Sequence, residues 1–129
     1  MNSAGNYRVL IVDDEPGLNL CLAEFLEDLD YAAVTAGTAG EAFQRMLDSG
    51  PFDVALVDLR LPDINGETLI LKAHDEWPEL HFIMQTGSTD YRLPDALLQT
   101  GMKPEQLLYK PIFDLDTVHE LIQRIMTEA

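Results

Sequence analysis

The chain has 129 residues, with 8 Lys and Arg against 23 Asp and Glu, and a formal net charge of −15. A domain typically has about 100–200 residues, so this length accommodates one domain, and a hydrophobic fraction of 47% is sufficient for a folded core. A surface this acidic repels nucleic acids and anionic membranes, so neither is expected as a partner. It suits a divalent cation or a basic protein surface instead.

The sequence has no feature typical of a secreted or membrane-spanning protein. Its opening residues lack the basic start and the apolar run of about 7–15 residues that form a signal peptide. The longest apolar runs, Val9–Val12 and Val54–Val57, are far shorter than the ~20 residues that span a bilayer. Cys21 is the single cysteine, which agrees with a reducing compartment. We therefore expect a cytoplasmic protein, with a loose tail over residues 1–6 and one folded domain over residues 7–129.

The first half of the chain alternates between strand and helix patterns. Val9–Val12 is a short β-branched run, typical of a buried strand in a parallel sheet. A helix is predicted from Pro16 onward, and a second strand over Tyr31–Ala36. The apolar stripe of the helix consists of Leu18, Cys21, Leu22, Phe25, Leu26 and Leu29.

A second helix is predicted between Thr38 and Gly50, because Thr38 is followed three residues later by Glu41, the spacing of a capping box. We expect this helix to bury Ala42, Phe43, Met46 and Leu47. Val54–Val57 then resembles the first strand in length and composition.

The second half continues the alternation less regularly. The patterns predict a helix over Gly66–Trp77, a strand over His81–Gln85, a short strand over Leu107–Tyr109 and a helix over Asp114–Met126. Between the last two strands, the fourth helix should begin only near Pro94 and end by Gly101. Five strands that alternate with helices predict a doubly wound α/β fold, with a parallel sheet covered by helices on both faces.

Polar side chains follow the predicted strands at one edge of this sheet. Asp13 and Asp14 follow the first strand, Asp58 the third, Thr86 the fourth and Lys110 the fifth. The carboxyl ends of parallel strands are where ligands bind in such folds. Three neighbouring carboxylates repel one another, and Mg²⁺, which prefers oxygen ligands, relieves this repulsion. Replacing Asp13 by Asn is therefore expected to weaken Mg²⁺ binding and to stabilise the metal-free protein.

In their order along the chain, these residues resemble the receiver domain of response regulators. The resemblance covers the chain from Tyr7 to about Met126 and implies a flavodoxin-like fold with strand order 2-1-3-4-5. The motifs that carry it are Asp13-Asp14-Glu15-Pro16, Asp58-Leu59-Arg60-Leu61-Pro62 with Gly66, Thr86-Gly87 and Lys110-Pro111.

The resemblance also implies a role for each site residue. Asp58 accepts a phosphoryl group from a histidine kinase or a phosphotransfer protein. Asp13, Asp14 and Asp58 hold Mg²⁺ together with the backbone carbonyl of Arg60. Thr86 and Lys110 bind the phosphoryl group and report its presence.

The domain would accordingly be a self-phosphorylating signalling switch with slow autodephosphorylation, and not a turnover enzyme. Phosphorylation would change the surface formed by the fourth helix, the fifth strand and the fifth helix. An output domain, an effector protein or a second copy of the chain in a homodimer would bind there.

Two features depart from the family pattern. Leu107 stands three residues before Lys110, where receiver domains usually carry an aromatic switch residue. Tyr109 lies on the same strand face as Leu107, because side chains alternate with a period of two, so Tyr109 is the candidate switch aromatic. The segment from Thr86 to Lys110 is also about two residues longer than usual. Both departures concern the output mechanism.

Two other interpretations compete with a receiver. An aspartate-nucleophile phosphohydrolase also uses a carboxylate after a parallel strand, but its Asp-x-Asp-x-Thr signature is replaced here by Asp13-Asp14-Glu15-Pro16-Gly17. A degenerate receiver would serve only as a binding module, and the presence of Asp58, Thr86 and Lys110 argues against it.

Overall fold

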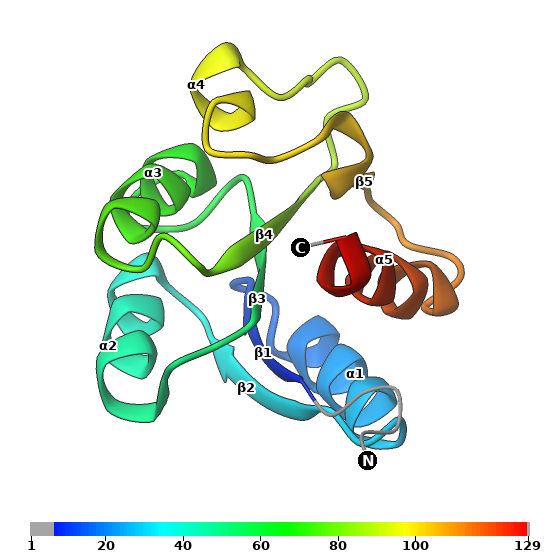
Figure 1. The fold of residues 1–129 in the computed structure, drawn as a ribbon. Coiled ribbons are helices and arrows are strands. Elements are labelled where there is room, and N and C mark those ends of the chain that lie inside the picture. Colours follow the sequence, from blue (N-terminus) through cyan, green and yellow to red (C-terminus); the bar gives the residue numbers. More distant parts are fainter. Residues whose placement is uncertain (1–6, 129) are drawn as a thin grey trace.

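The computed structural model describes residues 7–128, which form a five-stranded parallel sheet with helices on both faces (Figure 1). The strands stand in the order β2-β1-β3-β4-β5, and this confirms the predicted fold class and strand order. The five strands are β1 (Arg8–Val12), β2 (Ala32–Ala36), β3 (Val54–Asp58), β4 (His81–Thr86) and β5 (Leu107–Tyr109). The tail expected over residues 1–6 lies outside the described residues.

The helices cover the sheet in two groups (Figure 1). One face carries α1 (Pro16–Glu27) and α5 (Asp116–Glu128). The other carries α2 (Ala39–Ser49), α3 (Gly66–Glu76) and α4 (Asp95–Leu98), and a 3₁₀ helix over Pro104–Gln106 precedes β5.

The central strands are apolar because both of their faces are buried. In β1, Leu10 and Val12 pack toward α2 and α3, whereas Val9 and Ile11 pack toward α1 and α5. All four side chains are fully buried. Strand β3 alternates in the same way, as expected for the middle of a parallel sheet. Because β1 and β3 are neighbours, the residues that follow them lie side by side.

The buried face of α1 differs from the predicted apolar stripe. Leu22 and Leu26 are buried as predicted, but Cys21 is exposed, and Asn19 and Ala23 are buried in its place. The Asn19 amide donates to the backbone carbonyls of Asp13 and Ala36 at 2.7 and 3.3 Å. This turns Asn19 toward the sheet and moves Cys21 out to solvent, since successive helical residues are about 100° apart.

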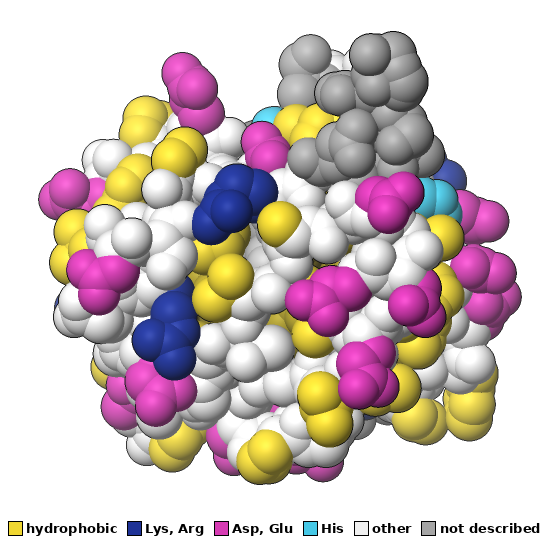
Figure 2. Space-filling model, turned by 90° about the horizontal axis from the view of Figure 1, so that it is seen from below, with side chains coloured by type: hydrophobic (Ala, Val, Ile, Leu, Met, Phe, Trp, Pro, Cys, Tyr) yellow, Lys and Arg dark blue, Asp and Glu magenta, His cyan; other side chains and the backbone are white. Residues whose placement is uncertain are grey.

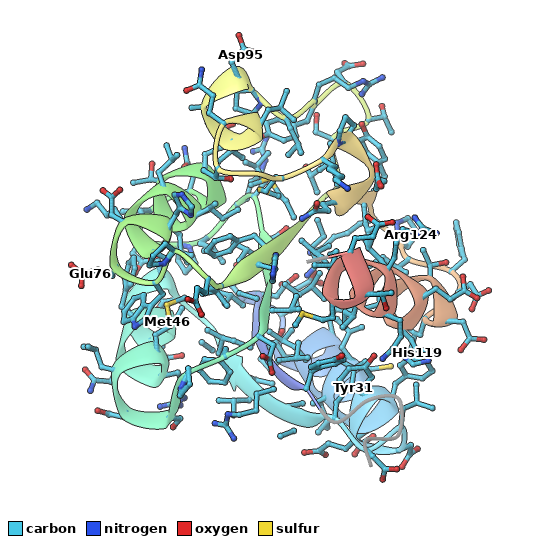
Figure 3. All side chains as sticks on the ribbon, viewed as in Figure 1. Tyr31, Met46, Glu76, Asp95, His119 and Arg124 are labelled. Atoms are coloured by element: carbon cyan, nitrogen blue, oxygen red, sulfur yellow. The ribbon has the colours of Figure 1, made fainter. Side chains whose placement is uncertain are left out.

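Helix α2 also departs from prediction at one position. Leu47 is 70% exposed, whereas its neighbour Met46 is buried and lies between α2 and α3 (Figure 3). On the other side of the sheet, Tyr31 and His119 lie together (Figure 3), with the Tyr31 hydroxyl 2.8 Å from His119 Nδ1. This contact joins the residue before β2 to α5.

Helix α4 is a single turn that begins late, as predicted. Pro94 is its N-cap, and the backbone turns at Gly101, which has a φ of 104°. Leu97 is its one buried residue.

Gly66 brings the start of α3 against the end of β3. Its backbone N–H donates to the Leu59 carbonyl at 2.7 Å. A Cβ atom at this position would lie 2.5 Å from the Asp58 carbonyl oxygen. The absence of a side chain at Gly66 therefore determines how closely α3 approaches Asp58.

We predict that Gly66→Ala lowers the free energy of unfolding by about 1–3 kcal/mol, because the added methyl group forces the backbone of Asp58 to move. Gly17→Ala is the matched control, since nothing lies within 4 Å of a Cβ at Gly17 in α1. The control should be neutral or stabilise by up to about 1 kcal/mol through helix propensity. Urea denaturation of the three proteins measures both effects, and equal stability of both variants would contradict the prediction.

Candidate functional site

Three carboxylates converge at the carboxyl ends of β1 and β3, as the sequence predicts. Asp13 and Asp14 directly follow β1, and Asp58 is the last residue of β3. One oxygen atom from each of the three carboxylates lies within 4.8 Å of the other two. Asp13 and Asp58 are buried, while Asp14 is exposed.

Lys110, directly after β5, reaches the same cluster. Its Nζ lies 2.7 Å from Asp13 Oδ2, 3.3 Å from Asp58 Oδ1 and 3.2 Å from Glu15 Oε1. The ammonium group therefore compensates part of the negative charge that the three aspartates bring together. Asp13 is the most completely bound of the three, because its Oδ1 also accepts the backbone N–H of Glu15 at 3.0 Å.

Of the two buried carboxylates, Asp58 is the less fully compensated. Burial, followed by the neighbouring charge of Asp13, raises the pKa of Asp58 from 3.8 to about 6 despite the opposing effect of Lys110. Burial lowers the pKa of Lys110, but its hydrogen bond and ion pair with Asp13 and its attraction to Asp58 outweigh burial and raise that pKa overall. Lys110 therefore stays charged, while Asp58 lacks a full counter-charge.

This donor set fits a hard divalent cation. Asp13, Asp14 and Asp58 offer oxygen atoms only, and the exposed Asp14 leaves one side open to water, which Mg²⁺ usually keeps in its coordination shell. Binding a cation here would also offset the repulsion among the carboxylates, which adds to burial in raising the pKa of Asp58. The arrangement can thus hold Mg²⁺ next to a carboxylate that is able to act as a nucleophile.

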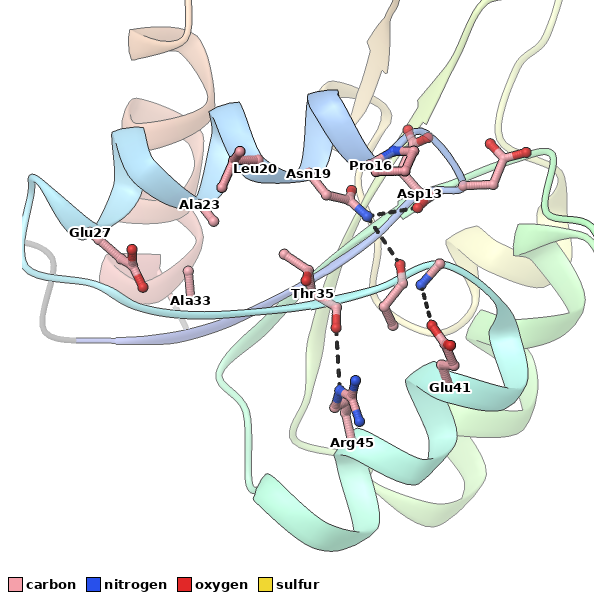
Figure 4. A pocket seen from close by; sticks show the side chains of 13 residues that line it. Asp13, Pro16, Asn19, Leu20, Ala23, Glu27, Ala33, Thr35, Glu41 and Arg45 are labelled. Atoms are coloured by element: carbon pink, nitrogen blue, oxygen red, sulfur yellow. Dashed lines mark hydrogen bonds between the residues drawn. The ribbon is translucent and has the colours of Figure 1, made fainter.

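The loops that carry the aspartates are held by polar residues that the sequence analysis missed. Figure 4 shows Asn19 between the end of β1 and the end of β2, in a groove of about 470 Å³ beside the cluster. In the loop after β3, Asp63 accepts the backbone N–H groups of Ala39 and Gly40 at the start of α2, both at 2.9 Å. These hydrogen bonds lower the pKa of Asp63. The only sequence signal for Asn19 is its place as a polar residue between Leu18 and Leu20 in an apolar helix.

Thr86 is the last residue of β4, and its hydroxyl accepts a hydrogen bond. It is 1% exposed, and its Oγ1 accepts the backbone N–H of Ser88 at 3.0 Å. Its carbonyl accepts the backbone N–H of Lys110 at 2.7 Å. Thr86 therefore connects the site to the loop after β4.

That loop, residues 87–93, is bound to two other elements. The Tyr91 hydroxyl donates to the carboxylate of Glu67 in α3 at 2.5 Å. Tyr109, 37% exposed in β5, donates its hydroxyl to the Tyr91 carbonyl at 2.8 Å. Arg92 donates to the Tyr109 hydroxyl at 2.7 Å, and its guanidinium lies 5.7 Å from the centre of the Tyr109 ring. Tyr109 is thus on the surface and already in contact with this loop, while Leu107 is buried.

A comparison with known families matches residues 9–123 to the response regulator receiver domain. The chain belongs to this family. It is a receiver domain of the two-component signalling systems, and its fold, strand order and acidic cluster agree with that assignment.

Solved receiver structures resemble the chain over nearly its whole length. The CheY-like receiver domain protein from Methanospirillum hungatei JF-1 is 31% identical, with a TM-score of 0.81, and the match covers 95% of this chain and 94% of that one. The response regulator TrrA from Thermotoga maritima, determined in complex with Mg²⁺ and BeF, is 25% identical with a TM-score of 0.79. That match covers 92% of this chain and 98% of TrrA.

Similar sequences occur within longer signalling proteins. Sensor protein TorS of Escherichia coli (strain K12) is 36% identical over 106 residues, which is 81% of this chain and 11% of TorS. Transcriptional regulatory protein GlrR of the same strain is 29% identical over 122 residues, which is 95% of this chain and 27% of GlrR. The receiver therefore spans a small part of these relatives.

The surface of the receiver is predominantly acidic. Figure 2 shows carboxylate side chains spread across one face with few lysines and arginines among them, in agreement with the net charge of −15. Between residues 7 and 128, no helix combines the length and the hydrophobicity needed to cross a membrane.

We predict that Asp58→Asn stabilises the metal-free receiver by about 1–2 kcal/mol near pH 7, because it removes the buried carboxylate whose charge is the less fully compensated. Each pKa unit corresponds to about 1.4 kcal/mol, and solvent near the site reduces the effect. Since the pKa of Asp58 is higher in the folded protein, ionisation destabilises the fold as the pH rises through about 6. At about pH 3, below the ordinary pKa of 3.8 as well, the carboxyl is mostly protonated in both states, so the gain should largely disappear there.

Denaturation in EDTA at both pH values measures this difference. The exposed Asp14 provides the control, since Asp14→Asn should change the stability by less than Asp58→Asn at pH 7. A gain for Asp58→Asn that persists unchanged at low pH would show that its cause is not the ionisation of Asp58.

Proposed function

We propose that Asp58 is the phosphoacceptor of this receiver and takes its phosphoryl group from a phosphohistidine of a histidine kinase or a phosphotransfer protein. One observation carries the proposal: the Asp58 carboxylate lies at the end of β3, 3.3 Å from the Lys110 ammonium and in one cluster with Asp13 and Asp14.

The transfer requires a nucleophile and local positive charge. A carboxylate oxygen of Asp58 forms a bond to phosphorus, while the phosphorus–nitrogen bond to the donor imidazole breaks and its electron pair stays on that nitrogen. The Lys110 ammonium, already beside Asp58, moves to one of the phosphoryl oxygens. The Thr86 hydroxyl donates to another.

Asp13, Asp14 and Asp58, with the backbone carbonyl of Arg60, are the groups that would hold Mg²⁺. When bound, the ion offsets the negative charge of the phosphoryl oxygens. The donor set supports this assignment because it contains oxygen atoms only. The complex of the related TrrA with Mg²⁺ and BeF gives it further support.

Phosphorylation then acts on the loop over residues 87–93 through Thr86. When the Thr86 hydroxyl turns to the phosphoryl group, it can no longer hold the Ser88 N–H in its present geometry. The loop rearranges and becomes more ordered, and its contacts with Tyr109 carry the change to β5. The surface of α4, β5 and α5 thereby reports the phosphorylated state, with Tyr109 as its aromatic residue.

This receiver works as a cytoplasmic signalling switch whose aspartyl phosphate is hydrolysed slowly. An output domain, an effector protein or a second receiver copy binds the surface of α4, β5 and α5. The receiver itself does not bind nucleic acids, because its net charge of −15 repels them.

Incubation with acetyl phosphate and Mg²⁺, followed by intact mass spectrometry, tests the acceptor. We expect the gain of one phosphoryl group in the wild type, no gain in Asp58→Asn, and a full gain in the control Asp75→Asn on the exposed surface of α3. Fast release of phosphate over many turnovers would favour a phosphohydrolase. No gain in the wild type would favour a receiver that only binds partners.

Hydrogen exchange with and without beryllofluoride tests the route through the loop. Protection should increase most over residues 87–93, and Thr86→Ala should abolish the increase. Thr89→Ala is the control within the same loop, because among residues 7–128 Thr89 forms a hydrogen bond through its backbone carbonyl and none through its side chain. If protection increases only around Tyr109 and the loop is unchanged, the route through Thr86 is wrong.

A further inference from the structure

Gln85 is a buried polar side chain near the carboxyl end of β4. It lies in β4 after Ile83 and Met84 and is 0% exposed, like both of these neighbours. A buried amide is unfavourable unless it is hydrogen-bonded, so its presence in an otherwise apolar strand requires a partner.

The partner is a carboxylate two strands away. Gln85 Nε2 donates to Asp13 Oδ2 at 3.1 Å. Strand β3 lies between β4 and β1, with Asp58 paired directly to Gln85. Neighbouring strands are about 4.8 Å apart, so the side chain must reach across β3. A shorter Asn would not reach Asp13, and an apolar side chain of equal length could not donate.

The other end of the amide has no partner. Gln85 Oε1 is buried and accepts no hydrogen bond among residues 7–128. The amide orientation follows from chemistry, because a carboxylate only accepts and the NH₂ group must face it. An apolar side chain would avoid the unfavourable burial of Oε1, so the contact with Asp13, and not packing, accounts for a glutamine here.

Gln85 and Lys110 bind the same oxygen atom. Asp13 Oδ2 lies 2.7 Å from Lys110 Nζ and 3.1 Å from Gln85 Nε2. In the proposed transfer, Lys110 turns from Asp13 to the phosphoryl group on Asp58. Gln85 would then be the remaining side-chain donor to Asp13 Oδ2 within the described part of the chain.

We propose that Gln85 is a positioning residue, which keeps the Asp13 carboxylate in its metal-binding orientation when Lys110 moves to the phosphoryl group. The inference rests on the proposed function of Asp58 and Lys110. Removing a group that orients a metal ligand in this way typically weakens metal binding by about 10–100-fold.

Titration calorimetry with Mg²⁺, in the absence and presence of beryllofluoride, tests the proposal on Gln85→Met. We expect the Mg²⁺ dissociation constant to rise by about tenfold, with a larger rise in beryllofluoride, where Lys110 no longer holds Asp13. Gln106→Met is the matched control. Gln106 is also a buried glutamine, but its amide donates to the Phe82 carbonyl at 2.7 Å, away from the acidic cluster.

Unchanged Mg²⁺ affinity in a folded Gln85→Met variant would overturn the proposal, as would an equal loss in Gln106→Met. NMR of the wild type decides the matter if the variant does not fold. The side-chain NH₂ resonances of Gln85 should shift with Mg²⁺ and those of Gln106 should not, and an unmoved Gln85 would again overturn the role. Failure of the phosphoacceptor function is distinguishable, because it appears as a wild type that binds Mg²⁺ but gains no phosphoryl group.

Discussion

The ion pairs of Lys110 with Asp13 and Asp58 allow three aspartates to share one edge of the sheet in a chain that already carries a net charge of −15. A buried carboxylate without a partner destabilises a fold strongly, and Asp13 is fully buried. Lys110 compensates Asp13 first, at the shorter distance, and leaves Asp58 incompletely compensated. Lys110 therefore offsets part of the negative charge of the cluster and leaves an excess, which suits a cation.

Much of the site could be predicted because the central strands end in carboxylates. Val9–Val12 and Val54–Val57 are recognisable as buried parallel strands, and parallel strands end at one edge. The positions of Asp13, Asp14 and Asp58 then follow from topology, without any knowledge of side-chain contacts. The late start of α4 was predictable for a similar local reason, since proline restricts the residue before it.

The residues that hold the site in place could not be predicted in this way. Gln85 and Asp13 are 72 positions apart, so no local pattern connects them. Asn19 lies between Leu18 and Leu20, and the buried face of the helix was predicted from its apolar residues alone. The predictions that Cys21 and Leu47 are buried were wrong because hydrophobic periodicity locates a helix face only to within about one residue. Asp13→Asn is no longer expected to stabilise the metal-free protein, because Asp13 is the carboxylate that Lys110 and Gln85 bind, whereas Asp58 is only partly compensated.

The single turn of α4 has a consequence for recognition. Four residues span about 6 Å, so α4 cannot offer a partner the row of side chains, spaced three and four positions apart, that docks into the grooves of another helix. The surface beside β5 instead presents main-chain groups and the Arg92–Tyr109 pair. A partner that docked on the α4 side of the receiver would therefore meet the loop over residues 87–93 and the end of β5, and not a long helix.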